Sequence, residues 1–226
     1  MNVAEAIRPV ARTRAVTILP LPRAVPESWM LVKRAIDIAL AVSVLILTLP
    51  VLVLAMLGIV AVSGGSPLFL QERVGLRGRR FRLFKLRTMI SGAHLLHHDM
   101  RPYNEVAGPV FKMRDDPRLH ALGAFLRRTS IDELPNFINV LRGDMSAVGP
   151  RPPLPCEVAH YDAYALRRLG VKPGVTCLWQ ISGRSQVSFD EWMALDNAYI
   201  DGWSPLVDLA IIARTIPAVL RGIGAH

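Results

Sequence analysis

Residues Ile38 to Val62, IALAVSVLILTLPVLVLAMLGIVAV, form a run of 25 residues without a charge. A helix of this length and composition can cross the hydrocarbon core of a lipid bilayer. Pro50 lies at the centre of the run and has no N–H to bond to the carbonyl of Ile46, so we expect a kink there. The run therefore predicts a membrane helix that is broken at its midpoint.

Basic residues flank the apolar run on both sides. Lys33 and Arg34 precede it. The arginines that follow it are Arg73, Arg77, Arg79, Arg80 and Arg82. Because basic flanks tend to remain in the cytosol, neither end is a natural candidate for export. We therefore favour a re-entrant membrane helix over residues 31–66, ahead of a straight span or a buried helix of a soluble core.

The residues before and after the start of the predicted helix lead to two further predictions. Residues 1–30 are rich in arginine and proline and lack the pattern of a signal peptide, so we expect a flexible basic tail. This tail either contacts anionic lipid head groups or is simply disordered. Lys33 and Asp37 are four residues apart, a spacing that allows an ion pair across one helical turn.

The composition of the whole chain limits its surroundings. It has 226 residues, of which 51% are hydrophobic, and a formal net charge of +9. The length suits one domain with an appendage. The charge indicates nucleic acid, phosphorylated substrates or an acidic membrane face as partners. Cys156 and Cys177 have neither disulfide-framework nor metal-ligand spacing, which indicates a reducing compartment.

After the break at Ser63–Pro67 the chain becomes amphipathic, and we place a globular domain at residues 67–226. Phe81 to Met89, FRLFKLRTM, predicts a short strand whose cations either guard a sheet edge or bind an anion. Leu206 to Leu220 is too short to span a membrane, and predicts an interfacial helix or a helix packed on the core. We expect a mainly α fold with a small β component (α+β).

The segment RRTSIDELPNFINVLRGDMSAVGPRP, Arg127 to Pro152, places two adjacent carboxylates, Asp132 and Glu133, before a predicted helix. Arg142 and Gly143 suit the end of this helix. Its apolar face consists of Leu134, Phe137, Ile138 and Leu141.

Two starts fit this helix. Ser130 and Glu133 form a capping box. Alternatively, Asp132 is the N-cap and Pro135 is the third helical residue, where its missing N–H costs nothing. We favour the second start because the first places Pro135 too deep in the helix. Either start leaves the acids at a helix N-terminus, where carboxylates also serve as ordinary caps.

Cations near the acids favour a functional site over simple capping. Arg127 and Arg128 precede the acids, and Arg151 lies between Pro150 and Pro152. A cap needs no such neighbours, whereas arginine binds phosphate oxygens bidentately. We therefore expect one carboxylate to attack phosphorus while the other binds a divalent cation.

The motif SIDELPNFINVLRGDMSAVGPRP, with FKLRTM before it and KPGVTCLWQISGRS after it, resembles a known family. It is similar to the bacterial sugar transferases that act on polyprenyl phosphate, the monotopic phosphoglycosyl transferases. The resemblance runs from about Lys33 to the C-terminus and includes YIDGWSPLVDLAIIARTIPAVLRG. Several linked motifs in the same order make it specific, and the length resembles the compact exopolysaccharide-initiating members.

The resemblance implies a re-entrant helix broken at Pro50 and a catalytic domain on the cytosolic face of the bacterial inner membrane. It implies transfer of a sugar 1-phosphate from a nucleotide sugar, such as a UDP-hexose, to undecaprenyl phosphate with Mg²⁺ as cofactor. Asp132 matches the nucleophile, which forms a covalent phospho-sugar intermediate as UMP leaves. Glu133 matches the partner of the nucleophile, which is associated with Mg²⁺. Asp132 is the second residue that we expect at the metal site.

Cations that would bind the substrates match the family pattern at Lys85, Arg127, Arg151 and Arg184. We add Arg87 and Arg128, which belong to the same clusters of charge. Two positions depart from the pattern. Leu49 stands where some members have serine before Pro50, which leaves Thr48 to satisfy the freed backbone. Cys177 replaces a common glycine, which puts a tight turn there in doubt.

Two other functions remain open on the sequence. A membrane-anchored, non-catalytic binder of anionic lipid or nucleic acid would explain the charge of +9. No recognition-helix motif or aromatic-interleaved basic surface accompanies that charge, so we do not expect nucleic acid as a partner. A Mg²⁺-dependent membrane phosphatase would use the same acids with water as the acceptor. An oligomer is compatible with each of these functions.

Overall fold

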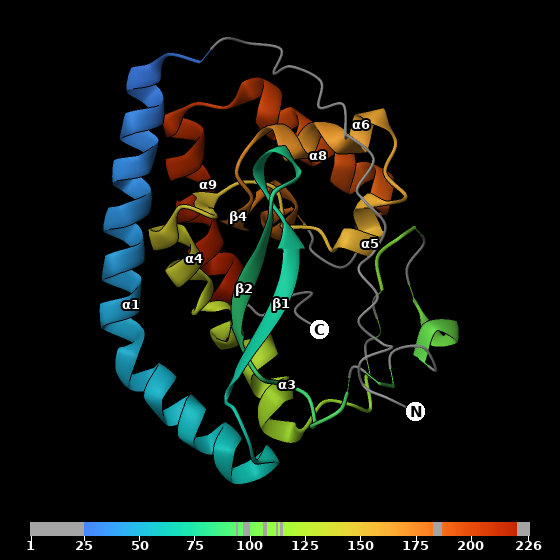
Figure 1. Cartoon of the computed structure of the whole chain (residues 1–226). Helices are drawn as coiled ribbons and strands as arrows, with labels where there is room; N and C mark the ends of the chain where they lie inside the picture. Colours follow the sequence, from blue (N-terminus) through green and yellow to red (C-terminus); the bar gives the residue numbers. More distant parts are fainter. Residues whose placement is uncertain are drawn as a thin grey trace.

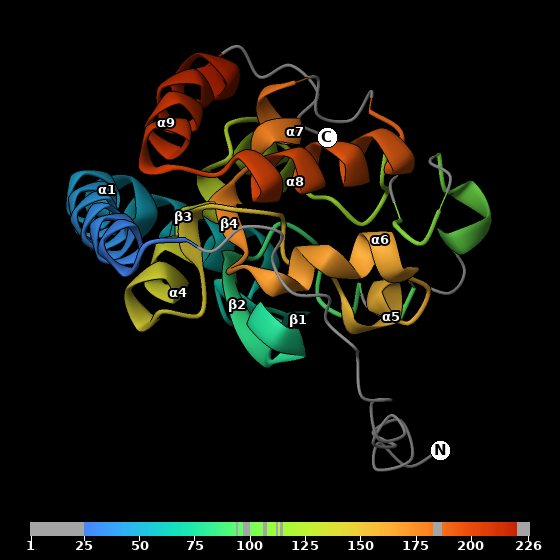
Figure 2. The ribbon, with the colours of Figure 1, turned by 90° about the horizontal axis from the view of Figure 1, so that it is seen from above.

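The computed structural model describes residues 25–220, apart from residues 94, 97–99, 106–107, 112, 114 and 183–186. These residues form a mostly helical fold with two sheets of two strands each (Figure 1, Figure 2). The expected α+β composition is thus confirmed. Of the expected basic tail, residues 1–24 lie outside this description.

The helices are α1 (Glu27–Ser63), α3 (Ala121–Arg128), α4 (Asn136–Arg142), α5 (Pro155–Val158), α6 (Ala163–Leu166), α7 (Leu178–Ile181), α8 (Phe189–Gly202) and α9 (Pro205–Leu220). The 3₁₀ turns are η1 (Leu76–Gly78), η2 (Arg101–Tyr103), η3 (Ile131–Glu133) and η4 (Arg167–Gly170). The strands are β1 (Leu68–Val74), β2 (Arg80–Leu86), β3 (Ser146–Val148) and β4 (Gly174–Thr176).

Helix α1 contains the apolar run and continues through Pro50 as one element of 37 residues. Figure 1 shows that it changes direction partway along its length, as the central proline predicts. The hydroxyl of Thr48 donates to the carbonyl of Val44 at 2.7 Å, so it does not serve the carbonyl of Ile46 that Pro50 frees. The kink is present, and the path of this helix through a bilayer stays a prediction.

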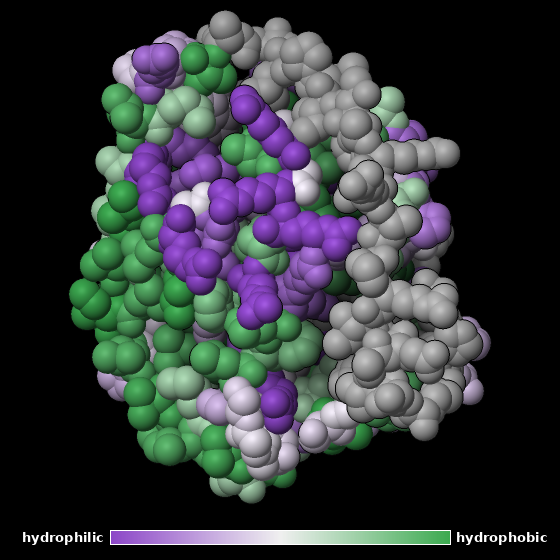
Figure 3. Space-filling view, viewed as in Figure 1, coloured by the Kyte–Doolittle hydropathy of each residue, from purple (hydrophilic) through white to green (hydrophobic). Residues whose placement is uncertain are grey.

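The outward face of α1 is apolar and exposed. Leu47 is 79% exposed and Leu54 is 70% exposed. The green surface over α1 in Figure 3 shows this side of the molecule. Among the described residues, α1 is the one helix long and apolar enough to cross a membrane, and only 17% of its most apolar segment is buried. This low burial contradicts the alternative of a buried helix in a soluble core and fits membrane association.

The inner face of α1 packs on the rest of the fold. Leu52, Ala55 and Ile59 form one core with Leu86 of β2 and Leu126 of α3. Figure 2 shows α1 along one side of the molecule, between α4 and α9. The second half of α1 is therefore held against the elements that carry the predicted site.

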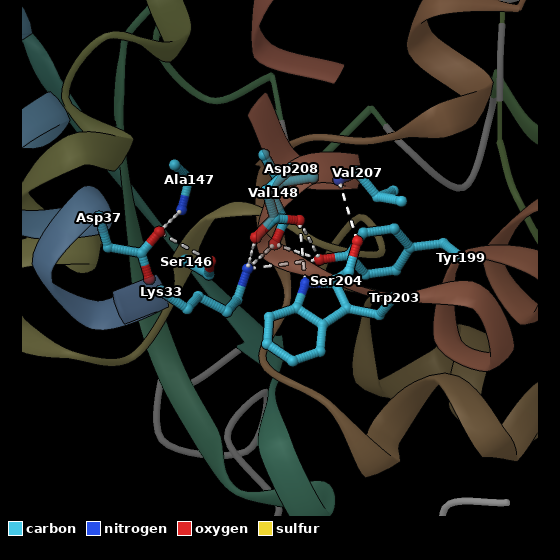
Figure 4. A network of polar contacts seen from close by, with 10 residues as sticks. All are labelled: Lys33, Asp37, Ser146, Ala147, Val148, Tyr199, Trp203, Ser204, Val207 and Asp208. Atoms are coloured by element: carbon cyan, nitrogen blue, oxygen red, sulfur yellow. Dashed lines mark hydrogen bonds and ion pairs between the residues drawn. The ribbon is translucent and has the colours of Figure 1, made fainter. Parts of the chain in front are cut away.

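The charged residues at the start of α1 attach it to distant parts of the chain (Figure 4). Lys33 pairs with Asp208 of α9 at 2.5 Å. Asp37 is buried and accepts hydrogen bonds from the Ser146 hydroxyl and the Ala147 N–H at 2.9 and 2.8 Å. The predicted ion pair between Lys33 and Asp37 is therefore wrong, because each finds a partner in the domain instead of across one helical turn.

The antiparallel hairpin of β1 and β2 confirms the strand predicted from FRLFKLRTM. Its register places Lys85 opposite Phe69 and Arg73 opposite Phe81. Since alternate residues of a strand face opposite sides, Lys85 and Arg73 share one face of the hairpin and Arg82 lies on the other. Figure 3 shows the hydrophilic side chains that gather over this hairpin.

The second sheet is a short parallel pair, with Ser146 beside Gly174 and Val148 beside Thr176. A Cβ atom on Gly174 would lie 2.1 Å from the backbone nitrogen of Gly149, so these two backbones approach closely only because residue 174 has no side chain. This contact fixes the loop that follows β3, which contains Arg151.

Helix α9 packs on the core, which confirms one of the two alternatives predicted from its sequence, and the interfacial alternative stays a prediction. Ile211 and Asp208 are buried, whereas Leu206 is 75% exposed and Ile216 is 60% exposed. One face therefore packs on the core, and the other presents apolar side chains to the surroundings, as an interfacial helix would.

Candidate active site

The acidic pair lies on the 3₁₀ turn η3, between α3 and α4. Ser130 has a left-handed backbone (φ 57°) and makes no side-chain capping bond. Pro135 precedes the first residue of α4 and is not its third residue. Both predicted helix starts are thus wrong, because the chain first makes a separate turn that carries the two acids. The predicted end at Gly143 is confirmed by its left-handed conformation (φ 83°).

Asp132 is the buried member of the pair, with 6% of its surface exposed. Burial raises the pKa of its carboxyl group to about 6, and the neighbouring charge of Glu133 contributes in the same direction. The nearby cations Lys85 and Arg127 oppose this rise but do not cancel it. The carboxylate is therefore ionised at neutral pH and poorly solvated, which suits a nucleophile.

Glu133 has the opposite shift. Its Oε1 accepts a hydrogen bond from the Lys85 ammonium at 2.6 Å. Burial by itself raises the pKa of Glu133. The charge and hydrogen bond of Lys85, with the charges of Arg151 and Arg73, lower this pKa by more, so the net shift is downward. Glu133 therefore remains ionised at pH values at which Asp132 takes up a proton.

Glu133 lines a pocket of about 70 Å³. Its charged lining consists of Glu133 and three cations, Arg73, Lys85 and Arg151. The remaining lining residues are Leu83, Asn136, Met145, Pro152, Gly174, Val175, Trp179 and Gln180. Three cations against one carboxylate leave the pocket with a positive charge, which attracts a phosphate or diphosphate.

The prediction from sequence missed Arg73 as a member of this site. It is 4% exposed and donates to the carbonyl of Pro152 at 2.8 Å and to the Gln71 side chain. Burial and the charge of Arg151 lower the pKa of Arg73 to about 9, so it stays cationic at neutral pH. Only the hairpin register, which puts Arg73 on the same face as Lys85, could have identified it.

Arg151 reaches the pocket from the loop after β3. Its guanidinium lies 3.9 Å from Glu157 and 5.7 Å from the centre of the Trp192 ring. Its own carbonyl accepts a hydrogen bond from Arg168 at 2.9 Å, and Arg168 in turn pairs with Asp196 at 2.8 Å. A buried layer of charge and aromatic rings therefore holds the loop in place.

The other predicted cations take different positions. Arg127 donates to the Thr88 hydroxyl at 3.0 Å, and its charge lowers the pKa of the adjacent Asp132. Arg87 donates to the carbonyl of Gly64 just after α1, and Arg128 is exposed. None of these three lines the pocket. Arg184 lies outside the described residues.

Cys177 does not disturb the backbone, although it replaces the glycine expected there. Its φ of −157° is extended, a conformation that any residue adopts. The buried thiol donates to the side chain of Gln180 at 3.3 Å, and burial raises its pKa. This cysteine is therefore an unreactive packing residue next to the pocket.

The chain is similar to several known proteins. The family described as "Bacterial sugar transferase" matches residues 28–222. The chain is 44% identical over 207 residues to "Galactosyl transferase CpsE" of Streptococcus agalactiae, which covers 88% of this chain and 44% of that protein. It is 40% identical over 199 residues to "Exopolysaccharide production protein ExoY" of Rhizobium meliloti, which covers 86% of this chain and 88% of that protein.

A third relative carries a more detailed name. The chain is 41% identical over 218 residues to "UDP-glucose:undecaprenyl-phosphate glucose-1-phosphate transferase" of Caulobacter vibrioides, covering 92% of this chain and 75% of that protein. The chain thus spans most of the ExoY protein but less than half of CpsE.

Proposed function

This chain belongs to the bacterial sugar transferase family, and from that membership we propose that it transfers a sugar 1-phosphate from a nucleotide sugar to a polyprenyl phosphate. The observation that carries the proposal is the buried carboxylate of Asp132, which does not line the pocket itself but precedes Glu133, which lines it together with three cations. The product of this reaction is a polyprenyl diphosphate sugar, the starting unit of a surface polysaccharide.

Asp132 is the nucleophile in this proposal. Its carboxylate oxygen attacks the sugar-bearing phosphorus of the donor, and the bond from this phosphorus to the bridging oxygen breaks, so that UMP leaves with that oxygen. An oxygen of polyprenyl phosphate then attacks the same phosphorus, and the bond to Asp132 breaks. Two successive displacements let two bulky substrates use one small pocket in turn.

The cations of the pocket hold the diphosphate and stabilise the charge that develops on its oxygens. Arg73 and Arg151 present guanidinium groups, which bind phosphate oxygens in pairs, and Lys85 adds a point charge. The bond from Lys85 to Glu133 orients the turn that also carries Asp132. The charge of Arg127 supports the ionised form of Asp132.

Mg²⁺ is the proposed cofactor, with Glu133 and the adjacent Asp132 as the acidic residues that would hold it. Carboxylate oxygens are the ligands this ion prefers, and the lowered pKa of Glu133 keeps that ligand anionic. When bound, the ion would neutralise the charge of the phosphates.

The membrane arrangement of the proposal follows from α1. Its exposed apolar face lies beside the cationic hairpin of β1 and β2 (Figure 3), which suits an acidic membrane surface. We propose that α1 enters the bilayer, bends at Pro50 and returns, so that the pocket stays at the cytosolic face of the bacterial inner membrane. The lipid phosphate of the acceptor lies at that depth.

The substrates that we propose are a UDP-hexose and undecaprenyl phosphate. The names of the relatives from Caulobacter vibrioides and Salmonella typhimurium, the latter an "Undecaprenyl-phosphate galactose phosphotransferase", mention this acceptor with glucose and galactose respectively.

UMP release from a panel of UDP-hexoses tests the proposal. Detergent-purified protein is incubated with each donor, Mg²⁺ and undecaprenyl phosphate, and the expected multiple-turnover release requires all three and disappears in Asp132→Asn. Sugar phosphate released to water without the lipid acceptor would instead identify a phosphatase. UMP release from no donor, with retained binding to anionic vesicles, would support the non-catalytic binder.

A further inference from the structure

The side-chain oxygen of Asn136 is buried without a partner. Asn136 is 4% exposed, and its Oδ1 accepts no hydrogen bond within the described part of the chain. Buried polar atoms in folded proteins are nearly always paired, so an unpaired acceptor on a residue that also lines a pocket points to a ligand that it meets in use.

Asn136 lies in the same pocket as Glu133. The two residues are three apart, and Leu134 and Pro135 between them have helical dihedral angles. Side chains at this spacing project from the same side of a helical turn. The two side chains therefore leave the same side of the turn, and both residues line the pocket.

The cations of the pocket do not serve this oxygen. Arg73 donates to the carbonyl of Pro152, and Lys85 donates to Glu133. What Asn136 can still accept is a hydroxyl or N–H donor of a ligand, or a hard metal cation. Magnesium and its analogues take carboxylate and side-chain amide oxygens in combination, which is the pair that Glu133 and Asn136 provide.

We propose that Oδ1 of Asn136 is a ligand of a divalent cation, together with Glu133; this inference rests on the proposed function of the pocket. Asn136 is a neutral ligand, and its neutrality has a consequence. The three cations of the pocket repel a free divalent ion, so the ion binds together with the diphosphate of the donor. A third carboxylate at this position would hold the metal more strongly but would weaken the attraction for the diphosphate.

Mn²⁺ is the probe for the test. The loss of its free-ion electron paramagnetic resonance signal is titrated against the full-length, detergent-solubilised protein in the presence of UDP, with UDP alone as the blank. Asn136→Ala should weaken Mn²⁺ binding about tenfold or more. Asn136→Asp should bind Mn²⁺ at least as tightly as the wild type and raise the KM for the nucleotide sugar.

Asn197→Ala is the matched control. Asn197 is also buried, and its amide oxygen has no partner among the residues that the structure describes. It does not line the pocket, so its loss should leave Mn²⁺ binding unchanged. Thermal unfolding of each variant identifies a loss of fold. If Asn136→Ala fails to fold, the Mn²⁺ affinity of Asn136→Asp tests the inference instead.

Three results would overturn the inference. They are absence of Mn²⁺ binding in the wild type, equal affinity in the wild type and Asn136→Ala, and weaker binding in Asn136→Asp. Equal affinity with a raised KM for the donor in Asn136→Ala would show that the amide contacts the substrate. UMP release by the wild type, measured separately, reports on the proposed function, so either idea can fail without the other.

Discussion

Asp132 and Glu133 are neighbours in the chain but hold protons differently. Burial raises the pKa of Asp132 to about 6, while Lys85 keeps the pKa of Glu133 below its usual range. A carboxylate attacks only when it is ionised. We therefore predict that kcat/KM is constant above about pH 7 and falls about tenfold per unit below pH 6 as Asp132 becomes protonated. A profile that stays flat down to pH 5 would contradict the role of Asp132.

Arg73 is the pocket cation that the sequence did not single out. Replacing it by Gln removes one buried charge from the pocket, and the loss of a charge-assisted hydrogen bond to phosphate predicts a KM for the donor about 10- to 100-fold higher. Steady-state UMP release measures this change. Arg80→Gln is the control, because Arg80 lies on the same hairpin, is exposed and pairs with Glu72. Equal effects of the two substitutions would contradict a specific role for Arg73.

There is a physical difference between Arg73 and Asn136 and the residues that the sequence singled out. Lys85, Glu133 and Arg151 lie in motifs where charge, proline and glycine indicate chemistry locally, and the structure brings all three into one pocket. Arg73 and Asn136 depend on strand register and on a 3₁₀ turn, which local spacing does not reveal.

Among the elements, α1 makes the clearest prediction. Pro50→Leu restores an N–H that can bond to the carbonyl of Ile46, so the helix should straighten. Spin labels at Val32→Cys and Val62→Cys, with Cys156→Ser to remove the exposed thiol, measure its length. A straight helix separates these positions by about 45 Å. The wild type should give a clearly shorter distance, and equal distances in the two proteins would show that Pro50 does not bend the helix.

Helix α3 packs closely against the backbone that follows β2. A Cβ atom on Gly123 would lie 1.9 Å from the carbonyl oxygen of Thr88, so Gly123→Ala forces these backbones apart. We expect a loss of about 1–3 kcal/mol in the free energy of unfolding, measured by denaturant titration. Activity should also fall, since Thr88 holds Arg127.

Gly202→Ala is the control for this substitution. Nothing lies within 4 Å of the added atom at the end of α8, so stability should be unchanged or slightly higher. If Gly123→Ala were as stable as this control, the close packing of α3 would be wrong. The sequence predicted neither this contact nor the turn before α4, because both depend on how helices meet.

At the scale of the whole molecule, buried charges tie α1 to the domain. Lys33 pairs with Asp208, which also accepts hydrogen bonds from Tyr199 and Trp203. Lys33→Met leaves Asp208 buried without its cation, and we predict a loss of about 3–5 kcal/mol in the free energy of unfolding. The double variant Lys33→Met with Asp208→Leu should recover most of this loss. A double variant no more stable than the single one would contradict a simple charge-burial effect.

The ion pair between Lys33 and Asp208 is an example of a contact that the sequence could not predict. Composition and the long apolar run predicted a membrane-associated helix and a basic α+β domain. The partner of Lys33 lies 175 residues away, and the local alternative, Asp37, was four residues away. A helix periodicity cannot choose between them, because the choice depends on the packing of α9 against α1.

Asp132 carries the transferred group in the proposed mechanism, and the mass of the intact protein shows whether it does. The protein is incubated with Mg²⁺ and the UDP-hexose that supports UMP release, without lipid acceptor, then quenched in acid and weighed. We expect the mass of the wild type to increase by one hexose phosphoryl group. This increase should be lost on adding undecaprenyl phosphate and should be absent in Asp132→Asn. An unmodified wild-type protein that still turns over with both substrates, or an adduct that persists in Asp132→Asn, would contradict it.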